Sequence, residues 1–147
     1  MKKEILFLAA LATCLSSFGQ TFEKTAQGGK FQTAQPTLNG EVIFYSPSIV
    51  RIVKYPSAEM PEKKSYPVIK TPEKVEISYK QNGNTVCMTS GKMTVTLDVA
   101  TGKVTYTDLK GETLLKEKVE GTNFIPRKDV NRDAFTVSQA FSLEPEE

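Results

Sequence analysis

Two carboxylates near the C-terminal end of the chain, Asp129 and Asp133, have the type and spacing that could support hydrolysis. A loop could bring them together, and two carboxyl groups about 5–5.5 Å apart can act as nucleophile and acid/base in retaining glycoside hydrolysis. The simpler interpretation, which we favour, is that both are solvated loop charges, partly neutralised by Arg127, Lys128 and Arg132. We therefore predict no catalytic residue and keep Arg127, Asp129, Arg132 and Asp133 only as candidates for substrate binding.

The same stretch has the opening spacing of a calcium loop. Asp129, Asn131 and Asp133 stand at alternate positions and could offer oxygen ligands. The stretch lacks the glycine that should follow and the bidentate glutamate at loop position 12, and Arg132 intrudes among the ligands. We predict no metal site.

The composition excludes several other kinds of chemistry. The 147 residues contain no histidine, so serine–histidine and cysteine–histidine nucleophiles and imidazole metal ligands are all excluded. Gly28 and Gly29 form an isolated pair without the context of a phosphate-binding loop, and we expect no cofactor. Nineteen basic against 17 acidic residues give a net charge of +2, which does not indicate a nucleic-acid partner.

Cysteine and tyrosine side chains are the remaining candidates. Cys87 has no histidine to activate it, so we interpret it as a small, largely apolar strand residue. Sugar-binding proteins use flat aromatic platforms, and this chain has five tyrosines but no tryptophan. On alternating strands these tyrosines are more often half-buried packing residues, although a sugar contact stays open for each of them: Tyr45, Tyr55, Tyr66, Tyr79 and Tyr106.

The N-terminus has the pattern of an export signal. Lys2 and Lys3 precede an apolar run of about 11 residues, and small residues before Gln20 suit signal-peptidase cleavage. The run is too short to span a bilayer, so we predict a signal peptide at 1–19, no transmembrane span, and a periplasmic or extracellular location. Cys14 leaves lipidation, and with it an outer-membrane lipoprotein, as an alternative.

The rest of the chain predicts short antiparallel strands and no helix. Apolar and polar residues alternate with a period of two, and turn signals recur every 8–12 residues, as in a sandwich or barrel. We expect strands at 41–45, 48–55, 75–80, 84–89, 92–98, 103–107, 113–117 and 134–143. Two stretches, 56–72 and 121–132, contain prolines and charges and predict loops.

The turns between these strands have their own signals. Asn82-Gly83 is typical of a tight hairpin turn, and further turns are expected at 90–91, 100–102 and 110–111. Asp98 and Asp108 bracket one hairpin, where we expect them to form turns rather than to catalyse. We predict an N-terminal extension at 20–35 and one antiparallel β-sandwich at 36–147, incomplete at its C-terminus because it stops directly after a strand.

The order of these elements resembles a known family. Ser65–Ile69, the run Val75–Asp108, Gly111–Leu115 and the closing Phe141–Glu147 are similar to the N-terminal, galactose-mutarotase-like β-sandwich of glycoside hydrolase family 31. In complete members the closing segment continues into a Tyr-Gly-Leu-Gly stretch and a catalytic barrel, which carries an Asp nucleophile and an Asp acid/base. The resemblance implies that the partner of this chain is that barrel, and that residues 121–132 help to wall its sugar pocket.

Three functions are consistent with this pattern. The first is an accessory module of a family 31 type glycosidase that hydrolyses α-glucosides or α-xylosides, inactive alone and meeting oligosaccharide only in the full-length protein. The second is a free-standing exported carbohydrate-binding module, and the third is a structural, adhesin-like sandwich. The first predicts that an apolar docking face remains exposed on the isolated chain.

Overall fold

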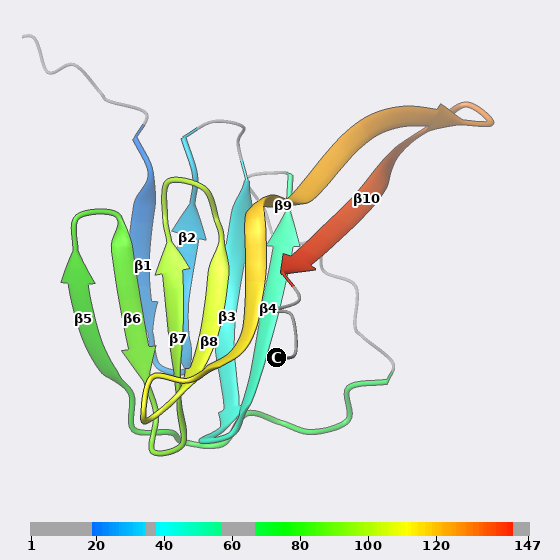
Figure 1. Ribbon diagram of the computed structural model, residues 1–147. Coiled ribbons are helices and arrows are strands. Elements are labelled where there is room, and N and C mark those ends of the chain that lie inside the picture. The colour runs from blue at the N-terminus through cyan, green and yellow to red at the C-terminus, as the bar shows by residue number, and fades with distance from the viewer. Residues whose placement is uncertain (1–18, 35–37, 57–66, 143–147) are drawn as a thin grey trace, which may run out of the picture.

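Ten β-strands and no helix make up the part of the chain that the structure describes, a computed structural model covering residues 19–34, 38–56 and 67–142 (Figure 1). The strands are β1 (Thr21–Thr25), β2 (Gly28–Gln32), β3 (Asn39–Ser46), β4 (Ile49–Tyr55), β5 (Ser78–Asn82), β6 (Thr85–Thr89), β7 (Met93–Asp98), β8 (Val104–Asp108), β9 (Thr113–Asp129) and β10 (Arg132–Ser142). Within the described ranges no helix could cross a membrane. The expected signal peptide, except Gly19, lies outside these ranges, as do Cys14 and Tyr66.

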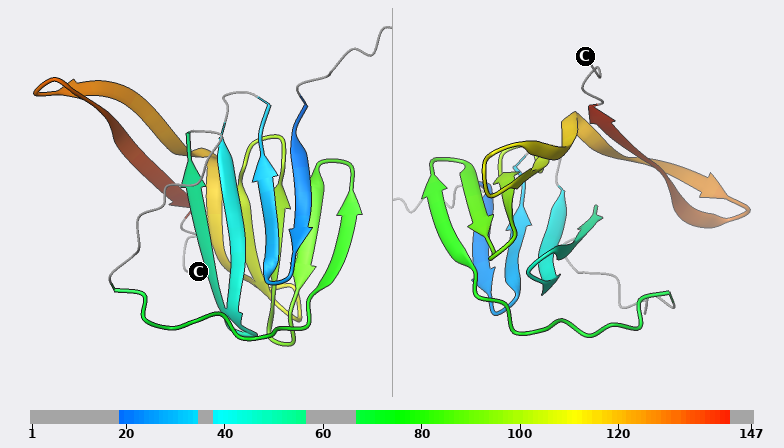
Figure 2. Two further views of the ribbon diagram at one scale, coloured as in Figure 1. Left: turned by 180° about the vertical axis from the view of Figure 1, so that it is seen from behind. Right: turned by 60° about the horizontal axis from the view of Figure 1, so that its bottom comes forward.

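The strands form two antiparallel sheets that pack face to face (Figure 2). Sheet A has the order β1-β2-β3-β4, and sheet B has the order β10-β9-β8-β7-β6-β5. Each strand pairs with its neighbour in the sequence, so short turns suffice to connect them within a sheet. The prediction of an all-β antiparallel sandwich is therefore confirmed.

The core follows the alternation in the sequence. On β7, Met93, Val95 and Leu97 are buried, while the residues between them are half-exposed. They pack in one cluster with apolar side chains of sheet A, including Phe44 and Val42, both 0% exposed. Burying such side chains contributes about 1.5–3 kcal/mol each, which explains why strict alternation fixes the inward face of a strand.

The turns of sheet B form where glycine and aspartate indicated them. Gly83, Gly102 and Gly111 all have positive φ angles, of 56°, 72° and 91°, which glycine adopts without steric cost. Asp98 Oδ1 accepts a hydrogen bond from the Ala100 N–H (2.9 Å), and Asp108 Oδ1 accepts one from the Lys110 N–H (2.8 Å). Both aspartates therefore form turns, as expected from the sequence.

Residues 20–35 are not an extension outside the sandwich. They supply β1 and β2, and Phe31 lies in the core at 3% exposure, so the sandwich begins at Thr21 instead of residue 36. The sequence pattern does not reveal β2, because Gly28 and Gly29 contribute no apolar side chain to the alternation. A Cβ on Gly28 would lie 2.1 Å from the Val42 carbonyl oxygen, so the close approach of β2 to β3 requires glycine there.

Two other boundaries differ from expectation. The strand predicted at 75–80 is β5, and its pairing with β6 starts only at Ser78, although Val75 is buried as its pattern suggested. The loop predicted at 121–132 is instead strand, because β9 runs to Asp129 and turns at Val130-Asn131 into β10. Pro126 misled the prediction, since a proline is tolerated in an edge strand whose nitrogen faces away from the partner.

Candidate functional site: a projecting hairpin and its buried root

The outer part of the β9–β10 hairpin extends well beyond the sandwich, and we call it the arm (residues 122–139). Its pairing runs from Thr122 opposite Gln139 to Asp129 opposite Arg132. Figures 1 and 2 show it leaving the body of the molecule as a twisted two-stranded ribbon. The four candidate binding residues all lie on this arm, near its tip.

The charged side chains of the tip are exposed and arranged across the two strands. Asp129 stands opposite Arg132, and Asp133 stands opposite Lys128, so each carboxylate faces a cation. Successive rungs of a ladder point to opposite faces, so the two carboxylates do not converge on one site. Within the described ranges no group of three or more His, Cys, Asp or Glu side chains could hold a metal ion. The tip offers hydrogen-bonding charges without the geometry of a catalytic pair.

The two faces of the arm differ in polarity. Phe124 stands opposite Val137, and Pro126 stands opposite Phe135, which places all four on one face. The rings of Phe124 and Phe135 meet edge to face with centroids 6.2 Å apart. The opposite face is mainly polar and carries Asn123, Ile125, Arg127, Ala134, Thr136 and Ser138. We call the first of these the apolar face of the arm.

The sequence pattern does not predict this apolar face, because the proline and charges of 121–132 favour a loop. The signal was present: Phe124 and Pro126 alternate, as do Phe135 and Val137 eleven residues later. Phe135 is 47% exposed and Val137 is 57% exposed. Ile125 is exposed as well but lies on the polar face, and the expected docking role of an exposed apolar face stays a prediction.

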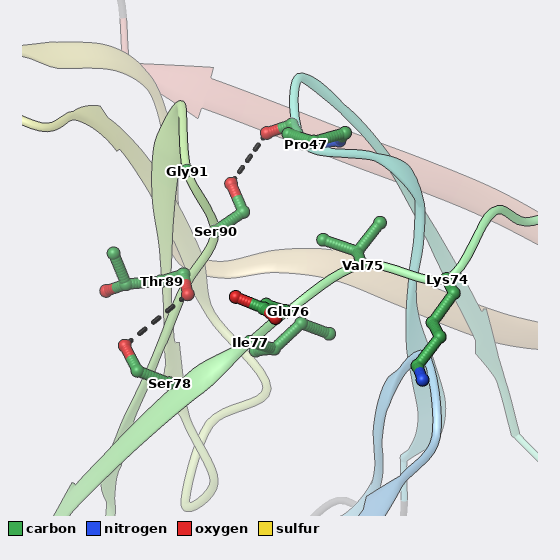
Figure 3. Close-up of a pocket in the computed structure, with 9 residues that line it drawn as sticks. All are labelled: Pro47, Lys74, Val75, Glu76, Ile77, Ser78, Thr89, Ser90 and Gly91. Atoms are coloured by element: carbon green, nitrogen blue, oxygen red, sulfur yellow. Dashed lines mark hydrogen bonds between the residues drawn. The ribbon is translucent and has the colours of Figure 1, made fainter.

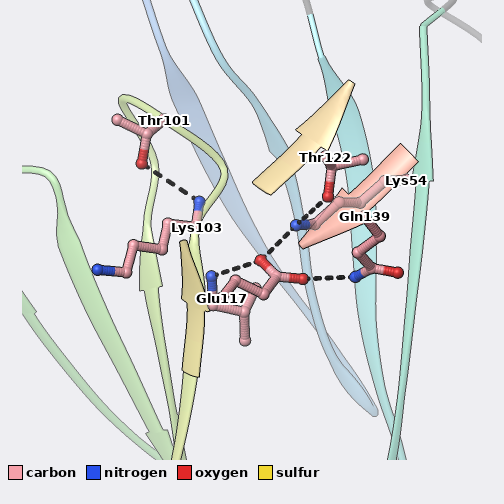
Figure 4. A network of polar contacts seen from close by, with 7 residues as sticks. Lys54, Thr101, Lys103, Glu117, Thr122 and Gln139 are labelled. Carbon is pink, nitrogen blue, oxygen red and sulfur yellow. Dashed lines mark hydrogen bonds and ion pairs between the residues drawn. The ribbon is translucent and has the colours of Figure 1, made fainter. Parts of the chain in front are cut away.

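A buried ionic network holds the root of the arm (Figure 4). Glu117 Oε2 accepts hydrogen bonds from Lys54 Nζ (2.6 Å) and from the Val104 N–H (2.8 Å). Glu117 Oε1 accepts one from Gln139 Nε2 (2.7 Å), and Lys54 Nζ also donates to Thr122 Oγ1 (3.0 Å). The network joins β4 of sheet A to β8, β9 and β10 of sheet B, so it connects both sheets to the base of the arm.

Burial shapes the electrostatics of this root. The side chains of Lys54 and Glu117 are 6% and 1% exposed. Desolvation lowers the pKa of Lys54, and the hydrogen bond and charge of Glu117 oppose that change. Desolvation, with a smaller contribution from the negative charge of Glu117, raises the pKa of Tyr106. Removing one partner from such a pair is strongly destabilising, so the network stabilises the junction between the arm and the body.

An open hollow of about 600 Å³ lies elsewhere, where the chain crosses from sheet A to β5 (Figure 3). It is lined by Pro47, Lys74, Val75, Glu76, Ile77, Ser78, Thr89, Ser90 and Gly91, none of them aromatic. The Ser90 hydroxyl donates to the Pro47 carbonyl (2.6 Å) and accepts from the Met93 N–H (3.2 Å), so it is engaged in the turn. The hollow lacks the stacking platform that a sugar site needs.

The described tyrosines and Cys87 have structural contacts. Tyr45 and Tyr55 are buried, while Tyr79 and Tyr106 are half-buried against the core. The Tyr79 hydroxyl donates to the Gly28 carbonyl oxygen (2.8 Å), which ties β5 to β2. Cys87 is half-buried on β6, with its Sγ 3.7 Å from Thr96 Oγ1. The four tyrosines are therefore packing residues in this structure.

Comparison with known proteins relates this fold to a family of enzymes. No protein-family profile matches the sequence. Alpha-glucosidase 2 of Bacillus thermoamyloliquefaciens is 34% identical over 90 residues, which are 61% of this chain and 11% of that protein. The crystal structure of the GH31 alpha-xylosidase of Xanthomonas citri superposes with a TM-score of 0.66 at 17% identity, covering 88% of this chain and 13% of that one.

These two similarities confirm the resemblance to glycoside hydrolase family 31. The alpha-glucosidase supplies the relationship in sequence, and the alpha-xylosidase shares the all-β fold. The chain spans only about a tenth of the length of either protein, 11% and 13% respectively. It is therefore similar to a small part of each of these two proteins.

Proposed function

We propose that this chain is the N-terminal accessory module of a family 31 type glycosidase that hydrolyses α-glucosides or α-xylosides. The observation that carries the proposal is the 34% identity to an alpha-glucosidase over 90 residues, 61% of this chain. The chain acts after export, directed by the leader at 1–19. Catalysis belongs to the barrel of the parent protein, and the module packs beside that barrel.

The arm is the part of the module that reaches the substrate pocket. Its root is fixed by Glu117 and Lys54, so the tip is presented in a defined direction. At the tip, Arg127, Asp129, Arg132 and Asp133 are exposed and can hydrogen-bond to sugar hydroxyls or to loops of the barrel. These side chains shape the rim of the pocket and do not take part in bond cleavage.

The first experiment is to sequence the source DNA for about 2 kilobases beyond codon 147, a length that would encode a catalytic barrel of roughly 250 residues. The proposal expects the frame to continue, directly or after one frameshift, into a Tyr-Gly-Leu-Gly-like stretch and a β/α pattern. The protein encoded by the continued frame, which we call the rejoined protein, should then release p-nitrophenol from p-nitrophenyl α-glucoside or α-xyloside. A true stop followed by unrelated sequence would contradict the proposal.

The role of the arm is tested in that rejoined protein. Arg127→Ala and Arg132→Ala should raise KM by about threefold to tenfold, since an exposed hydrogen bond contributes about 0.5–1.5 kcal/mol. Lys80→Ala is the matched control, because Lys80 is exposed on β5 at the opposite edge of sheet B. An unchanged KM in both arginine variants would show that the arm does not form part of the pocket rim.

Glycan affinity of the isolated chain separates this proposal from a free-standing binding module. The chain from Gln20 to Glu147 should show no measurable affinity for malto- or xylo-oligosaccharides in calorimetry, because its described tyrosines are engaged in packing. Clear binding would favour the carbohydrate-binding module instead.

A further inference from the structure

Sheet A has four strands and sheet B has six. The last strand of sheet A is β4, whose outer edge has no partner strand among the described residues, while sheet B continues through β9 to β10. Leu115 on β9 stands opposite Tyr106, which packs against the core, so Leu115 faces inward as well. It is nevertheless 40% exposed. The inner face of sheet B is therefore uncovered at this point, which we call the open side.

The inner face of sheet B continues onto the arm across a register shift between Gln139 and Phe141. Glu117 points inward to Lys54, and Phe141 stands opposite Glu117 on the same face. Beyond it, Thr122 and Gln139 both bond to the buried pair, so their rung also faces inward. The next inward rungs are those of the apolar face of the arm. Apolar side chains thus line this face on both sides of the polar Glu117 and the Thr122–Gln139 rung: Leu115, Phe141, Phe124, Val137, Pro126 and Phe135.

We infer that the free edge of β4 accepts a further strand from the parent polypeptide, whose apolar side chains cover the open side and the apolar face of the arm. A strand added to an exposed edge gains main-chain hydrogen bonds, while its alternate side chains enter the uncovered face. β4 suits this role, because Ile49–Tyr55 contains no proline and is rich in β-branched residues. The inference rests on the proposed function, since that function supplies the remaining polypeptide.

The position of β10 favours the parent polypeptide over other occupants. Ser142 stands opposite Lys116, so the last described strand returns along β9 to the open side. The chain corresponds to 13% of the solved alpha-xylosidase, which leaves ample polypeptide to supply the strand. A second copy of this chain is the competing occupant, and the test separates the two.

Amide hydrogen exchange measured by mass spectrometry tests the inference on peptides that cover β4. In the chain from Gln20 to Glu147, the alternate amides of β4 that point away from β3 should exchange rapidly. In the rejoined protein they should be protected by more than about a hundredfold, as amides of an inner strand are. Equal exchange of these amides in the two proteins would overturn the inference, and so would a reading frame that ends at codon 147.

Two adjacent leucines provide a matched pair of variants in the rejoined protein. Leu115→Lys places a charge where the added strand should pack, so it should abolish the protection of β4. Leu114→Lys changes the neighbouring residue, which is 60% exposed and precedes the inward rung, and should leave the protection intact. Circular dichroism of both variants checks that the sandwich is folded. Equal protection of β4 in both would contradict the inference.

The remaining outcomes are distinguishable. Concentration-dependent protection of β4 in the isolated chain, with dimers in light scattering, would assign the edge to a second copy and overturn the inference. A rejoined protein that protects β4 but hydrolyses neither substrate would support the added strand while the proposed function fails. A rejoined protein that hydrolyses a substrate but leaves β4 unprotected would support the proposed function and overturn the inference of an added strand.

Discussion

The body of the sandwich and the arm share the same alternation of apolar and polar residues. Their apolar side chains are buried in the body and exposed on the arm. On β7 of the body, Val95 and Leu97 are 0% exposed. On β10 of the arm, Phe135 and Val137 alternate in the same way but are 47% and 57% exposed. The comparison teaches that alternation determines which side chains share a face, whereas burial requires a second segment to cover that face. The body has this cover within the chain, and no segment among the described residues covers the arm.

The largest expected effect contrasts two phenylalanines. Phe44→Ala removes a ring that is 0% exposed in the core and should lower the free energy of unfolding by about 3–5 kcal/mol. Phe135→Ala removes a half-exposed ring from the arm and should cost about 1 kcal/mol or less. Urea unfolding of the chain from Gln20 to Glu147, followed by circular dichroism, measures both. Equal losses would mean that the arm is packed as tightly as the body.

The next effect contrasts two carboxylates. Glu117→Ala leaves the buried ammonium of Lys54 without its partner and should cost about 3–5 kcal/mol. Asp133→Ala removes an exposed carboxylate at the tip and should change stability by no more than about 0.5 kcal/mol. The same urea titrations check this prediction. A small loss for Glu117→Ala would show that the root does not hold the arm.

A smaller effect concerns the aspartates at turns. Asp108 Oδ1 accepts hydrogen bonds from the backbone N–H groups of Lys110 and Glu112, so Asp108→Ala should cost about 1–2 kcal/mol. Asp129→Ala, at the turn of the arm, should be nearly neutral, within about 0.5 kcal/mol. Thermal unfolding of the two variants compares them directly. A larger stability loss for Asp129→Ala than for Asp108→Ala would show that the turn of the arm contributes more to stability than the turn at Asp108.

The smallest effect is a dependence on alkaline pH. Burial raises the pKa of Tyr106, so the folded chain keeps that proton more tightly than the unfolded chain, whose tyrosines titrate near pH 10. The stability from this group is complete below about pH 10 and is lost as the pH rises further. Tyr106→Phe should therefore weaken the decline in stability between pH 10 and 11, by at most about 1.4 kcal/mol per pH unit.

The contribution of Lys54 to this pH dependence has the opposite sign. Its pKa is lowered in the folded chain, so its contribution becomes more favourable as the pH approaches 10.5. Comparing the Tyr106→Phe variant with the unsubstituted chain at each pH cancels the Lys54 contribution. An identical pH profile in the two proteins would show that Tyr106 is not buried in solution.

Most strands of sheet B were predictable because their pattern is local. The Asn82-Gly83 turn and the alternation Met93, Val95, Leu97 specify a hairpin and its inner face from neighbouring residues alone. β1 and β2 were not predictable in the same way. Gly28 and Gly29 contribute no side chain to the pattern, and their value lies in the close approach to β3 and β1, which is a tertiary contact.

The candidate site was predictable in position but not in form. The four charged residues near the tip were identified from their types, yet the proline and charges of 121–132 hid a strand that only its pairing with β10 reveals. Nothing local marks Glu117 as buried, because its partners lie on other strands: Lys54 is 63 residues away and Gln139 is 22 residues away. Such a network depends on how the sheets are stacked.

The sequence by itself therefore determined the all-β class, the turns of sheet B and the inward faces of its strands, since each depends on residues within a few positions of one another. Only the tertiary structure decided which charges are buried and which apolar faces are covered. Glu117 is buried because Lys54 of sheet A packs against it, and Phe135 is exposed because it lies on the arm, outside the stacked sheets. Desolvation depends on segments that are distant in sequence, and no local pattern encodes their final positions.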